Sequence, residues 1–537
     1  MGSLYFGDNL FVLRDEIKSE SVDLVYLDPP FNSKRDYNLL FKTPKGHNSD
    51  AQIAAFEDSW HWGEQAEREF AELLHQQNTD VSEMIQSLRR FLNESDMMAY
   101  LTMMANRLIE LHRVLKPSGS LYLHCDPTAS HYLKVVLDAV FGGENFVNEI
   151  VWKRSDAKGD AGQGSKHFGR VNDVILFYSK KENEQTFNAQ FLPMEDEYIE
   201  HWYRHTDPDG RRYKLDNMLG PGGAAKGNPQ YEVMGVTRYW RYSKQRMEDL
   251  INEGRVVQTN PGTVPMYKRY LDESKGVPLT TNWSDIRPIH GSATEKLGYP
   301  TQKPLSLLER IVKASSNEGD LILDPFCGCG TAVHAAETLK REWIGIDITH
   351  LAISLIEKRM KDAFPSISFQ VHGTPTDLDG ARNLAERDKY QFQWWACSLV
   401  NAQPYQGKKK GSDGGIDGLL FFQDDEKGAK KIIVSVKGGE HVGVTMVKDL
   451  IATVQKENAA IGLFITLAEP TRPMTTEAVR AGFYQSPKGD VPKIQILTID
   501  DLLSGKEKPQ YFDMSSGVYN FKKAKVEKQK VEQKQLL

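Results

Sequence analysis

An acid, two prolines and an aromatic ring end an apolar segment at residues 22–27, in the order Asp28-Pro29-Pro30-Phe31. The segment is predicted to be a buried strand, and open α/β sheets bind their ligands at the carboxyl ends of strands. A strand that simply terminates at prolines, with an exposed acid, is the structural alternative that this motif leaves open.

These residue types suit one particular chemistry. An exocyclic base amine is a poor nucleophile because its lone pair is delocalised into the ring. Acceptors on both amine hydrogens, the Asp28 carboxylate and the Pro29 carbonyl, would favour the tetrahedral form that carries a lone pair. Pro29 and Pro30 would hold this geometry stiffly, and Phe31 could stack on a base removed from the duplex.

A second apolar segment, residues 321–324, runs into a turn and a predicted helix with the sequence Asp324-Pro325-Phe326-Cys327-Gly328-Cys329-Gly330-Thr331. Glycines 328 and 330 allow a sharp bend and a close approach of a ligand to the backbone. The next predicted strand ends at Asp347, about 20 residues after Asp324, where an acid suits a ribose diol. A lone Gly-x-Gly is more often a tight turn, but the two acids favour a ligand site. The cysteines lack zinc-site spacing and are interpreted as small turn residues.

Apolar runs that alternate with longer helical patterns predict the elements that position these residues. Such a rhythm is typical of an α/β fold with a mostly parallel sheet. The expected strands are 22–27, 119–124, 321–324 and 343–347, and the expected helices are 97–115, 128–140, 305–315, 331–339 and 351–363. Beyond a polar passage at 373–387, a helix, two strands, a helix, a strand and a helix predict a separate C-terminal domain.

The middle of the chain differs in composition. Residues 200–270 combine many arginines with tryptophans and tyrosines. Arginine suits both phosphate contacts and the reading of guanine, so this region is predicted to bind DNA. An ordinary mixed surface over packed tyrosines is the alternative. The candidate DNA-binding residues are Arg204, Arg211, Arg212, Arg238 and Arg241.

In the C-terminal domain, Asp417 precedes one predicted strand and Lys437 ends the next. Adjacent strands could bring the two side chains together. An acid that holds Mg²⁺ beside a lysine is what water attack on a phosphodiester requires. An acidic turn with an unrelated lysine is the alternative.

Taken together, the motifs resemble those of the beta group of DNA amino-methyltransferases. Residues 28–31 resemble their catalytic motif and residues 324–330 their S-adenosylmethionine loop. The segments at 5–8, 151–154, 172–178 and 301–304 resemble further family motifs. The resemblance covers roughly residues 1–370. It implies a Rossmann-like methyltransferase domain with an inserted target-recognition region, and a cofactor site made by Asp8, Lys303, Pro304, Asp324, Phe326, Gly328, Gly330, Thr331 and Asp347.

The resemblance also implies a substrate. Asp rather than Ser at the start of the catalytic motif favours adenine N6, in double-stranded DNA, over cytosine N4. The alternative is a cytosine-N4 methyltransferase whose C-terminal domain binds DNA without cleaving it. The arginine-rich region corresponds to the family's target-recognition insertion.

The run from 392 to about 466 resembles Mrr-type restriction endonucleases of the PD-(D/E)xK superfamily. The resemblance implies a nuclease site at Asp417, Ser435 and Lys437, with Mg²⁺ on Asp417. Two residues depart from the pattern: Ser435 replaces the usual Glu or Gln, and Gln393 replaces a helical Glu. Fewer carboxylates would hold a metal more weakly, so cleavage and simple DNA binding both stay open.

Composition sets the remaining limits. The chain has 537 residues and a formal charge of −6, which averages an acidic stretch at 57–96 against basic segments that include Lys408–Lys410. No apolar run suits a membrane span and no signal peptide is seen. Four cysteines indicate a reducing, cytoplasmic setting. A homodimer is compatible with the sequence. The expected division is 1–185 (catalytic half, with an acidic helical insertion at about 43–96), 186–287 (target recognition), 288–372 (cofactor half), 373–387 (linker), 388–520 (Mrr-like) and 521–537 (Lys-rich tail).

Overall fold

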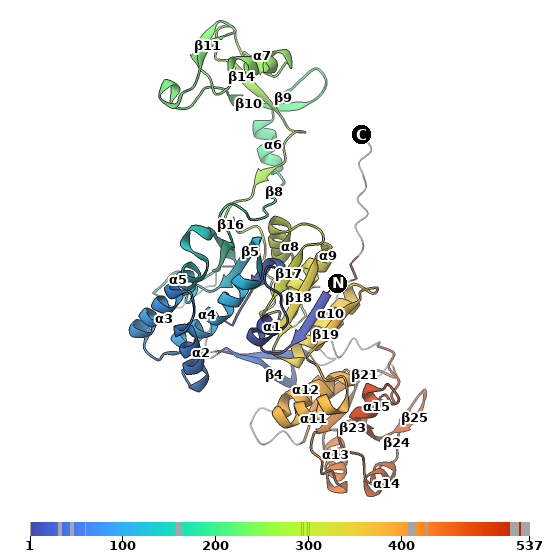
Figure 1. Cartoon of the computed structure of the whole chain (residues 1–537). Helices are drawn as coiled ribbons and strands as arrows, with labels where there is room; N and C mark the ends of the chain where they lie inside the picture. The colour runs from blue at the N-terminus through green and yellow to red at the C-terminus, as the bar shows by residue number, and fades with distance from the viewer. Residues whose placement is uncertain are drawn as a thin grey trace. The chain divides into compact units, whose positions relative to one another are not determined.

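The computed structural model of the chain contains two compact units, Met1–Asn188 with Thr281–Leu537, and Ala189–Thr280. Figure 1 shows the second unit in green to yellow-green. The structure describes residues 2–30, 35–42, 48–58, 61–156, 164, 166–290, 293, 295–297, 299, 301–405, 415–425, 428–515 and 526–527. Phe31, the Lys408–Lys410 patch and nearly all of the Lys-rich tail lie outside these ranges.

A nine-stranded sheet with the order β16-β6-β7-β5-β2-β17-β18-β1-β19 forms the centre of the first unit. Its neighbours are parallel except where β7 (Asn172–Ser179) pairs with β5 (Leu115–Cys125) and with β6 (Phe146–Lys153). The prediction of a mostly parallel sheet is therefore confirmed. The other strands are β1 (Gly2–Phe6), β2 (Val22–Leu27), β16 (Asn282–Trp283), β17 (Leu321–Asp324), β18 (Glu342–Asp347) and β19 (Phe369–His372).

Strands β2 and β17 are hydrogen-bonded neighbours although about 300 residues separate them in the chain. Leu24 lies opposite Ile322 and Val25 opposite Leu323. From this pair the sheet continues outward in opposite directions, through β5 on one side and β18 on the other. Such a reversal of strand order leaves a crevice at the carboxyl ends of the two central strands.

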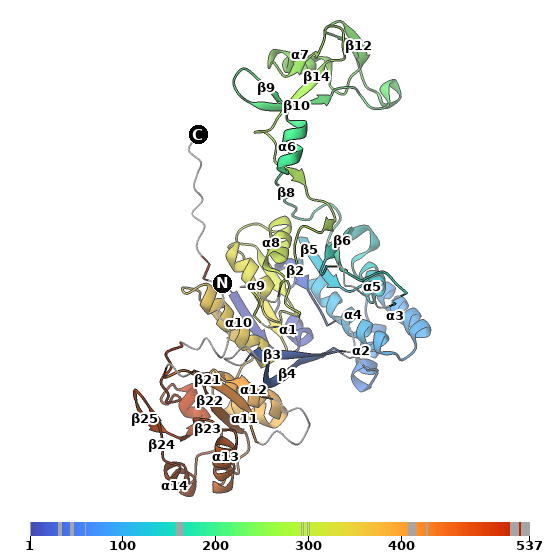
Figure 2. The ribbon, with the colours of Figure 1, turned by 180° about the vertical axis from the view of Figure 1, so that it is seen from behind.

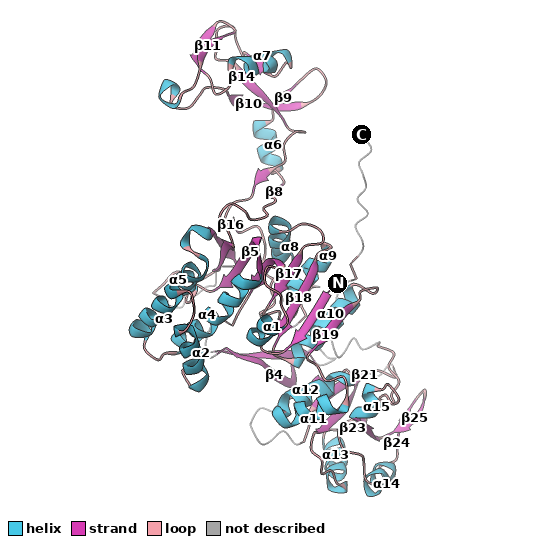
Figure 3. Cartoon of the chain, viewed as in Figure 1, coloured by secondary structure: helices cyan, strands magenta, loops and turns pink. Residues whose placement is uncertain are grey.

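Helices flank this sheet, as the cyan ribbons of Figure 3 show beside the magenta strands. Helix α4 (Asp96–Val114) is buried along most of its length, and with α1 (Asn9–Asp15) and α5 (Ser130–Phe141) it contributes to one large core around β2 and β5. Helices α2 (Glu64–Leu74) and α3 (Thr79–Leu92) pack on α4, and the four helices α2–α5 stay together in both views of Figures 1 and 2. On the cofactor side lie α8 (Leu305–Ser315), α9 (Thr331–Thr338) and α10 (His350–Ala363).

The insertion expected to be helical over about 43–96 is only partly helical. Its first part forms β4 (Asn48–Asp58), which pairs antiparallel with β3 (Arg35–Lys42). Helices α2 and α3 follow as predicted. The alanine- and acid-containing stretch at 48–58 favours a helix locally, but pairing with β3 overrides this weak preference.

The second unit is built from small antiparallel sheets. One has the order β13-β14-β10-β9 and another pairs β11 (Gln230–Val233) with β12 (Val236–Tyr239). The strands of the first are β9 (His205–Thr206), β10 (Arg212–Asn217), β13 (Val256–Val257) and β14 (Met266–Tyr270). A core of Met218, Val233, Trp240, Met247 and Leu250 lies beneath helix α7 (Lys244–Asn252). Helix α6 (Asp196–Trp202) and a ribbon of β8 (Phe191–Leu192) and β15 (Val277–Pro278) complete it.

The C-terminal region has its own five-stranded sheet, with the order β20-β21-β22-β23-β26. Its strands are β20 (Gln403–Pro404), β21 (Gly418–Phe422), β22 (Lys430–Lys437), β23 (Ile461–Thr466) and β26 (Ile494–Thr498). Around it lie α12 (Lys389–Leu399), α13 (Val444–Lys456), α14 (Arg472–Arg480) and α15 (Ile499–Leu503), and β24 (Phe483–Ser486) pairs with β25 (Gly489–Pro492). The predicted order of helix, two strands, helix, strand and helix matches α12, β21, β22, α13, β23 and α14, whereas β20, β24, β25, β26 and α15 were not predicted.

Residues 373–387 were predicted to be a linker, and this prediction is wrong for the second half of the range. Residues Leu378–Arg387 form helix α11, which begins at the N-cap Asp377. Ala381, Leu384 and Ala385 are buried in the C-terminal core. Their spacing of i, i+3 and i+4 places them on one face of a helix. The polar residues around them made this apolar pattern hard to recognise in the sequence.

Candidate functional site

A cavity of about 250 Å³ lies at the carboxyl ends of β2, β17 and β18. It brings together residues from both halves of the first unit, as the sequence predicted. Of the predicted residues, those that line it are Asp8, Asp28, Pro29, Pro30, Lys303, Asp324, Phe326, Gly328, Thr331 and Asp347. Gly330 directly precedes α9 and Pro304 is the N-cap of α8, so both border this site.

The Asp28 carboxylate forms an ion pair and hydrogen bond with the Lys303 ammonium group. Both side chains are largely buried, with 16% and 10% of their surface exposed. The contact joins the end of β2 to the segment before α8, which lies far away in the sequence. Lys303 therefore reaches Asp28 directly, in addition to lining the cavity beside the glycine turn.

Asp347 is held by three donors. Its Oδ2 atom accepts a hydrogen bond from the Gly328 amide at 2.9 Å, and its Oδ1 atom accepts from the Thr349 amide and hydroxyl, both at 2.9 Å. Each carboxylate oxygen can accept more than one hydrogen bond. The side chain is therefore fixed in place and retains acceptor capacity toward the cavity.

Gly328 and Gly330 both have left-handed backbone conformations, with φ of +50° and +72°. A Cβ atom at Gly328 would lie 3.1 Å from the Tyr299 ring, and one at Gly330 would lie 2.9 Å from the Ile356 side chain. Only glycine satisfies both the conformation and the space. The turn consequently brings bare backbone to the cavity wall.

Burial dominates the electrostatics of this wall. It raises the pKa of Asp347 to about 6, although the bonds from Thr349 and Gly328 oppose the shift. It also raises the pKa of Asp324 well above the ordinary value, and the negative charges of Asp28 and Asp347 act in the same direction. Clustered carboxyl groups with raised pKa values are typical of ligand-binding sites.

Several residues of the site were not predicted. Arg107, on α4, donates hydrogen bonds to Asp8 Oδ1 at 2.9 Å and to Asn9 Oδ1 at 2.6 Å. It is 5% exposed and lines the cavity together with Tyr26, Tyr299 and Ile348. An arginine inside the apolar pattern of a buried helix was the available signal for Arg107, because such a charge is buried only when paired.

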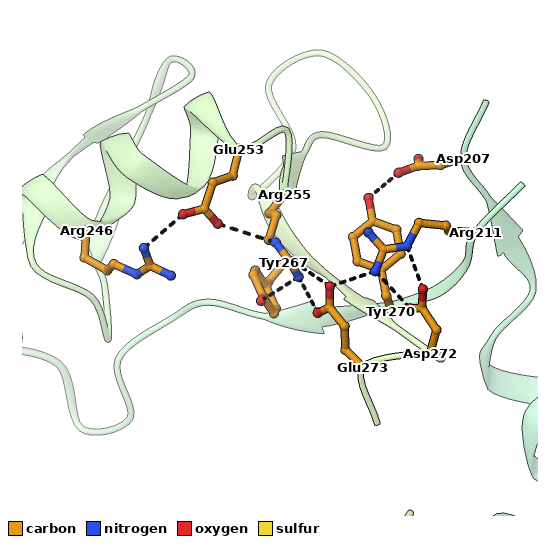
Figure 4. A network of polar contacts seen from close by, with 9 residues as sticks. All are labelled: Asp207, Arg211, Arg246, Glu253, Arg255, Tyr267, Tyr270, Asp272 and Glu273. Carbon is orange, nitrogen blue, oxygen red and sulfur yellow. Dashed lines mark hydrogen bonds and ion pairs between the residues drawn. The ribbon is translucent and has the colours of Figure 1, made fainter. Parts of the chain in front are cut away.

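The arginines of the second unit fall into two groups. Arg211 donates to both Asp272 oxygens, at 2.8 and 2.9 Å, and Arg255 donates to both Glu273 oxygens at 2.6 Å (Figure 4). Arg211 also reaches Glu273, at 2.7 Å, and the two arginines hold the pKa of Glu273 at about 2, Arg255 most strongly. This network connects the neighbouring strand ends within the unit.

Arg212 is also used internally, because its Nε atom donates to the Tyr203 carbonyl at 2.9 Å. Arg204, Arg238 and Arg241 are exposed and form no ion pair with any residue that the structure describes. Arg238 only donates to the neighbouring Thr237 carbonyl, at 3.0 Å. Of the five predicted DNA-binding arginines, only Arg211 forms an ion pair with a described residue. Arg212 is exposed but held by two backbone carbonyls, and the other three make the fewest contacts within the unit.

In the C-terminal region, strand pairing brings Asp417, Ser435 and Lys437 together. Asp417 Oδ2 accepts from the Val436 amide at 2.7 Å and lies 3.6 Å from Lys437 Nζ. Asp417 Oδ1 accepts from Gln393 Nε2 at 3.0 Å, and Lys437 Nζ donates to Ser435 Oγ at 2.9 Å. The predicted juxtaposition is thus present.

The donor set of this second site is weak for Mg²⁺, because Asp417 is the one carboxylate among the three residues predicted for it and its oxygens already accept hydrogen bonds from the protein. Mg²⁺ prefers an octahedron of oxygen ligands and is usually held through one or two carboxylates. Within the described ranges, no group of three or more His, Cys, Asp or Glu side chains could hold a metal ion. Nor does any described helix combine the length and apolar character of a membrane span.

Comparisons with known proteins agree with this geometry. A family profile described as "DNA methylase" matches residues 22–358, and one described as "Restriction endonuclease" matches residues 384–503. The type II methyltransferase M.EcaI of Enterobacter cloacae is 30% identical over 361 residues, covering 66% of this chain and 69% of its own. The Mod subunit of the type III enzyme StyLTI of Salmonella typhimurium is 26% identical over 63% of this chain and 50% of its own.

Among solved structures, a Thermus thermophilus protein described as a DNA modification methylase, in complex with S-adenosyl-L-methionine, matches 69% of this chain and 98% of its own. The identity is 16% and the TM-score 0.34. The extent of the family match decides the class: the chain belongs to the DNA methylase family that acts on amino groups, N6 or N4. Its C-terminal region is an Mrr-like restriction endonuclease domain.

Proposed function

We propose that this methylase transfers a methyl group from S-adenosylmethionine to N6 of adenine in double-stranded DNA. The observation that carries the proposal is the pairing of β2 with β17, which places Asp28 and the glycine turn on one cavity. Asp347 offers acceptors for a ribose and the turn offers close backbone approach, so the residues fit a nucleoside-type cofactor. When bound, S-adenosylmethionine supplies an electrophilic methyl group.

The chain's own residues prepare the amine. Asp28 and the Pro29 carbonyl accept its two hydrogens and favour the form with a localised lone pair, while Pro29 and Pro30 keep the acceptors in place. The base reaches this depth only when it is flipped out of the duplex. Lys303 donates to Asp28 Oδ2 in the structure, and because a carboxylate accepts more than one hydrogen bond, Asp28 can hold Lys303 and the amine at the same time.

Nucleoside analysis tests the proposal. Duplex DNA is incubated with the protein and S-adenosylmethionine, digested and measured by mass spectrometry. N6-methyladenine is expected, and Asp28→Ala should abolish it while cofactor binding, measured by calorimetry, persists. A product consisting only of N4-methylcytosine would reject the adenine assignment and leave the methylase family assignment untouched.

For the second unit we propose target recognition through Arg204, Arg238 and Arg241. Each phosphate contact contributes a slope of about −0.9 to the dependence of log affinity on log salt concentration. Replacing Arg238 and Arg241 by Ala should therefore weaken DNA binding and flatten the slope. Arg211→Ala is the matched control, because its loss breaks the network of Figure 4 and should lower stability without changing the slope. An unchanged slope in the double variant would contradict the assignment.

For the C-terminal domain we propose DNA binding without cleavage. The supporting observation is that Asp417 is the one carboxylate among the residues predicted for this site, with Ser435 and Gln393 where related nucleases carry further acidic or amide ligands. Unmethylated plasmid incubated with the protein and Mg²⁺ or Mn²⁺ should stay intact. Cleavage that disappears in Asp417→Ala would instead identify an active nuclease.

A further inference from the structure

Three buried polar side chains form a continuous hydrogen-bonded series beneath the cavity. The Tyr26 hydroxyl lies 3.2 Å from His124 Nδ1, and His124 Nε2 lies 3.1 Å from Asp173 Oδ2. They stand on three neighbouring strands, β2, β5 and β7. Tyr26, His124 and Asp173 are 2%, 0% and 2% exposed, so the positions of their hydrogen atoms follow from their own contacts.

Asp173, at the end of this hydrogen-bonded series away from the cavity, fixes the direction of the hydrogen bonds. Asp173 Oδ1 pairs with Arg154 Nε at 3.3 Å. Burial opposes ionisation of Asp173, but the hydrogen bond from His124 and the charges of Lys303 and Arg154 prevail and lower its pKa. A carboxylate only accepts hydrogen bonds, so His124 donates to it through Nε2–H, and in the neutral tautomer with this proton the Nδ1 atom accepts from the Tyr26 hydroxyl.

Tyr26, at the other end of the hydrogen-bonded series, reaches the candidate active site. Tyr26 lines the cavity, and it precedes Asp28 by two residues, so the two side chains share one face of the strand end. When the hydroxyl hydrogen of Tyr26 is directed to His124, its oxygen keeps a lone pair that can accept a proton. Burial, with the charge of Asp28, raises the pKa of Tyr26 and keeps the hydroxyl protonated at rest.

The reaction needs such an acceptor. Methyl transfer forms a bond between the amine nitrogen and the methyl carbon, and the nitrogen, which retains both hydrogens, then carries a positive charge. One N–H bond must break to give the neutral methylated base. In the proposed complex the Asp28 carboxylate is shared between Lys303 and an amine hydrogen, so an acceptor for the released proton within the same cavity wall has a role.

We propose that Tyr26, His124 and Asp173 form a relay that receives this proton. The amine N–H bond breaks as an O–H bond forms on Tyr26, and the original Tyr26 proton moves to His124 Nδ1. The imidazolium that results is stabilised by the Asp173 carboxylate, in the manner of the buried acid of a catalytic triad. The proton returns to water by the reverse route once the product has left. The proposal rests on methyl transfer to an amine and holds for adenine N6 and cytosine N4 alike.

A purely structural role for these hydrogen bonds makes a different prediction, and the chain contains a matched control. Tyr122, on β5, has an equally buried hydroxyl that contacts Ser315 Oγ at 2.7 Å. It does not line the cavity. Tyr26→Phe and Tyr122→Phe therefore each remove one buried hydroxyl bond, but only the first removes a link of the relay.

The test measures methyl transfer to duplex DNA in a single turnover, so that product release does not hide the chemical step. Positioned acid–base groups contribute about 10²–10⁴-fold to rates, and a relay behind the first acceptor should contribute at the lower end. Tyr26→Phe should slow transfer about a hundredfold, with melting temperature and cofactor affinity like those of Tyr122→Phe. A rate for Tyr26→Phe equal to that of Tyr122→Phe overturns the relay. An inactive wild-type protein would instead defeat the proposed function.

Chemical rescue provides a second readout that a structural role would not move. His124→Gly leaves space that imidazole can fill, with its N–H directed to Asp173. 1-Methylimidazole fills the same space but has no N–H to donate. Recovery of the single-turnover rate with imidazole alone supports the relay, whereas equal recovery with both compounds shows that His124 acts only by filling space and overturns it.

Discussion

Cofactor affinity should depend on pH through Asp347. Burial raises the pKa of this carboxyl from 3.8 to about 6, and only the ionised form accepts hydrogen bonds with both oxygens. A group of this pKa is about nine-tenths ionised at pH 7 and about one-tenth ionised at pH 5. If the ionised form binds the ribose, the dissociation constant for S-adenosylmethionine should rise about ninefold over this interval.

Calorimetric titration at pH 7 and pH 5 measures this change, and Asp347→Asn is the control. The variant should bind the cofactor more weakly than the wild type, with a dissociation constant that hardly changes between the two pH values. A wild-type constant that is the same at both pH values refutes the reasoning. If the pH dependence persists in Asp347→Asn, another group of the cavity is responsible for it. Asp324, which is also buried and raised in pKa, is the first residue to replace.

The same carboxyl affects the unliganded protein with the opposite sign. Its folded-state pKa lies above the ordinary value, so its contribution to stability is fully present below about pH 4 and is lost as the pH rises through about 6. Acidification toward pH 5 should thus favour the folded apoprotein through this group while it weakens the binding of the cofactor. Melting curves with and without S-adenosylmethionine should therefore converge as the pH falls.

Three substitutions test the packing around the site. Gly330→Ala should destabilise the protein by about 2–5 kcal/mol, because it combines a left-handed backbone with a contact at 2.9 Å; Gly319→Ala, left-handed but with open space around it, should cost only about 1–2 kcal/mol in urea unfolding. Arg107→Met removes the buried partner of Asp8 and should cost about 3–5 kcal/mol, so a stability within about 1 kcal/mol of wild type would show that this contact contributes little. Leu384→Ala should cost about 2–5 kcal/mol if α11 belongs to the C-terminal core, and an effect typical of an exposed linker would contradict that placement.

The strands that carry the chemistry were predictable because each is a short, nearly continuous apolar run. Residues 22–27, 321–324 and 342–347 are buried strands, and their final acids, Asp28, Asp324 and Asp347, line one cavity. The adjacency of β2 and β17, whose motifs lie about 300 residues apart, is seen only in the structure. What periodicity could not supply was the order of the strands, which depends on long-range pairing.

The errors also have physical causes. Helix α11 was interpreted as a linker because its polar residues outnumber the three that it buries, Ala381, Leu384 and Ala385. DNA contact by Arg211 and Arg212 stays a prediction, but composition does not show that both guanidinium groups already have partners within the protein. Their acceptors, Asp272, Glu273 and the Tyr203 carbonyl, come from other segments and are reached only after folding.

The ribbon of β8 and β15 closes the second unit where its chain enters and leaves. Phe191 lies opposite Pro278 and Leu192 opposite Val277, so the two ends of the unit are held side by side by the unit itself. A segment with such ends can be exchanged as a cassette, because its replacement needs no new closure of the surrounding sheet. Under the proposed role of the second unit in target recognition, recombination between Asn188 and Thr281 would exchange the DNA target in a single step and leave the residues of the cavity unchanged.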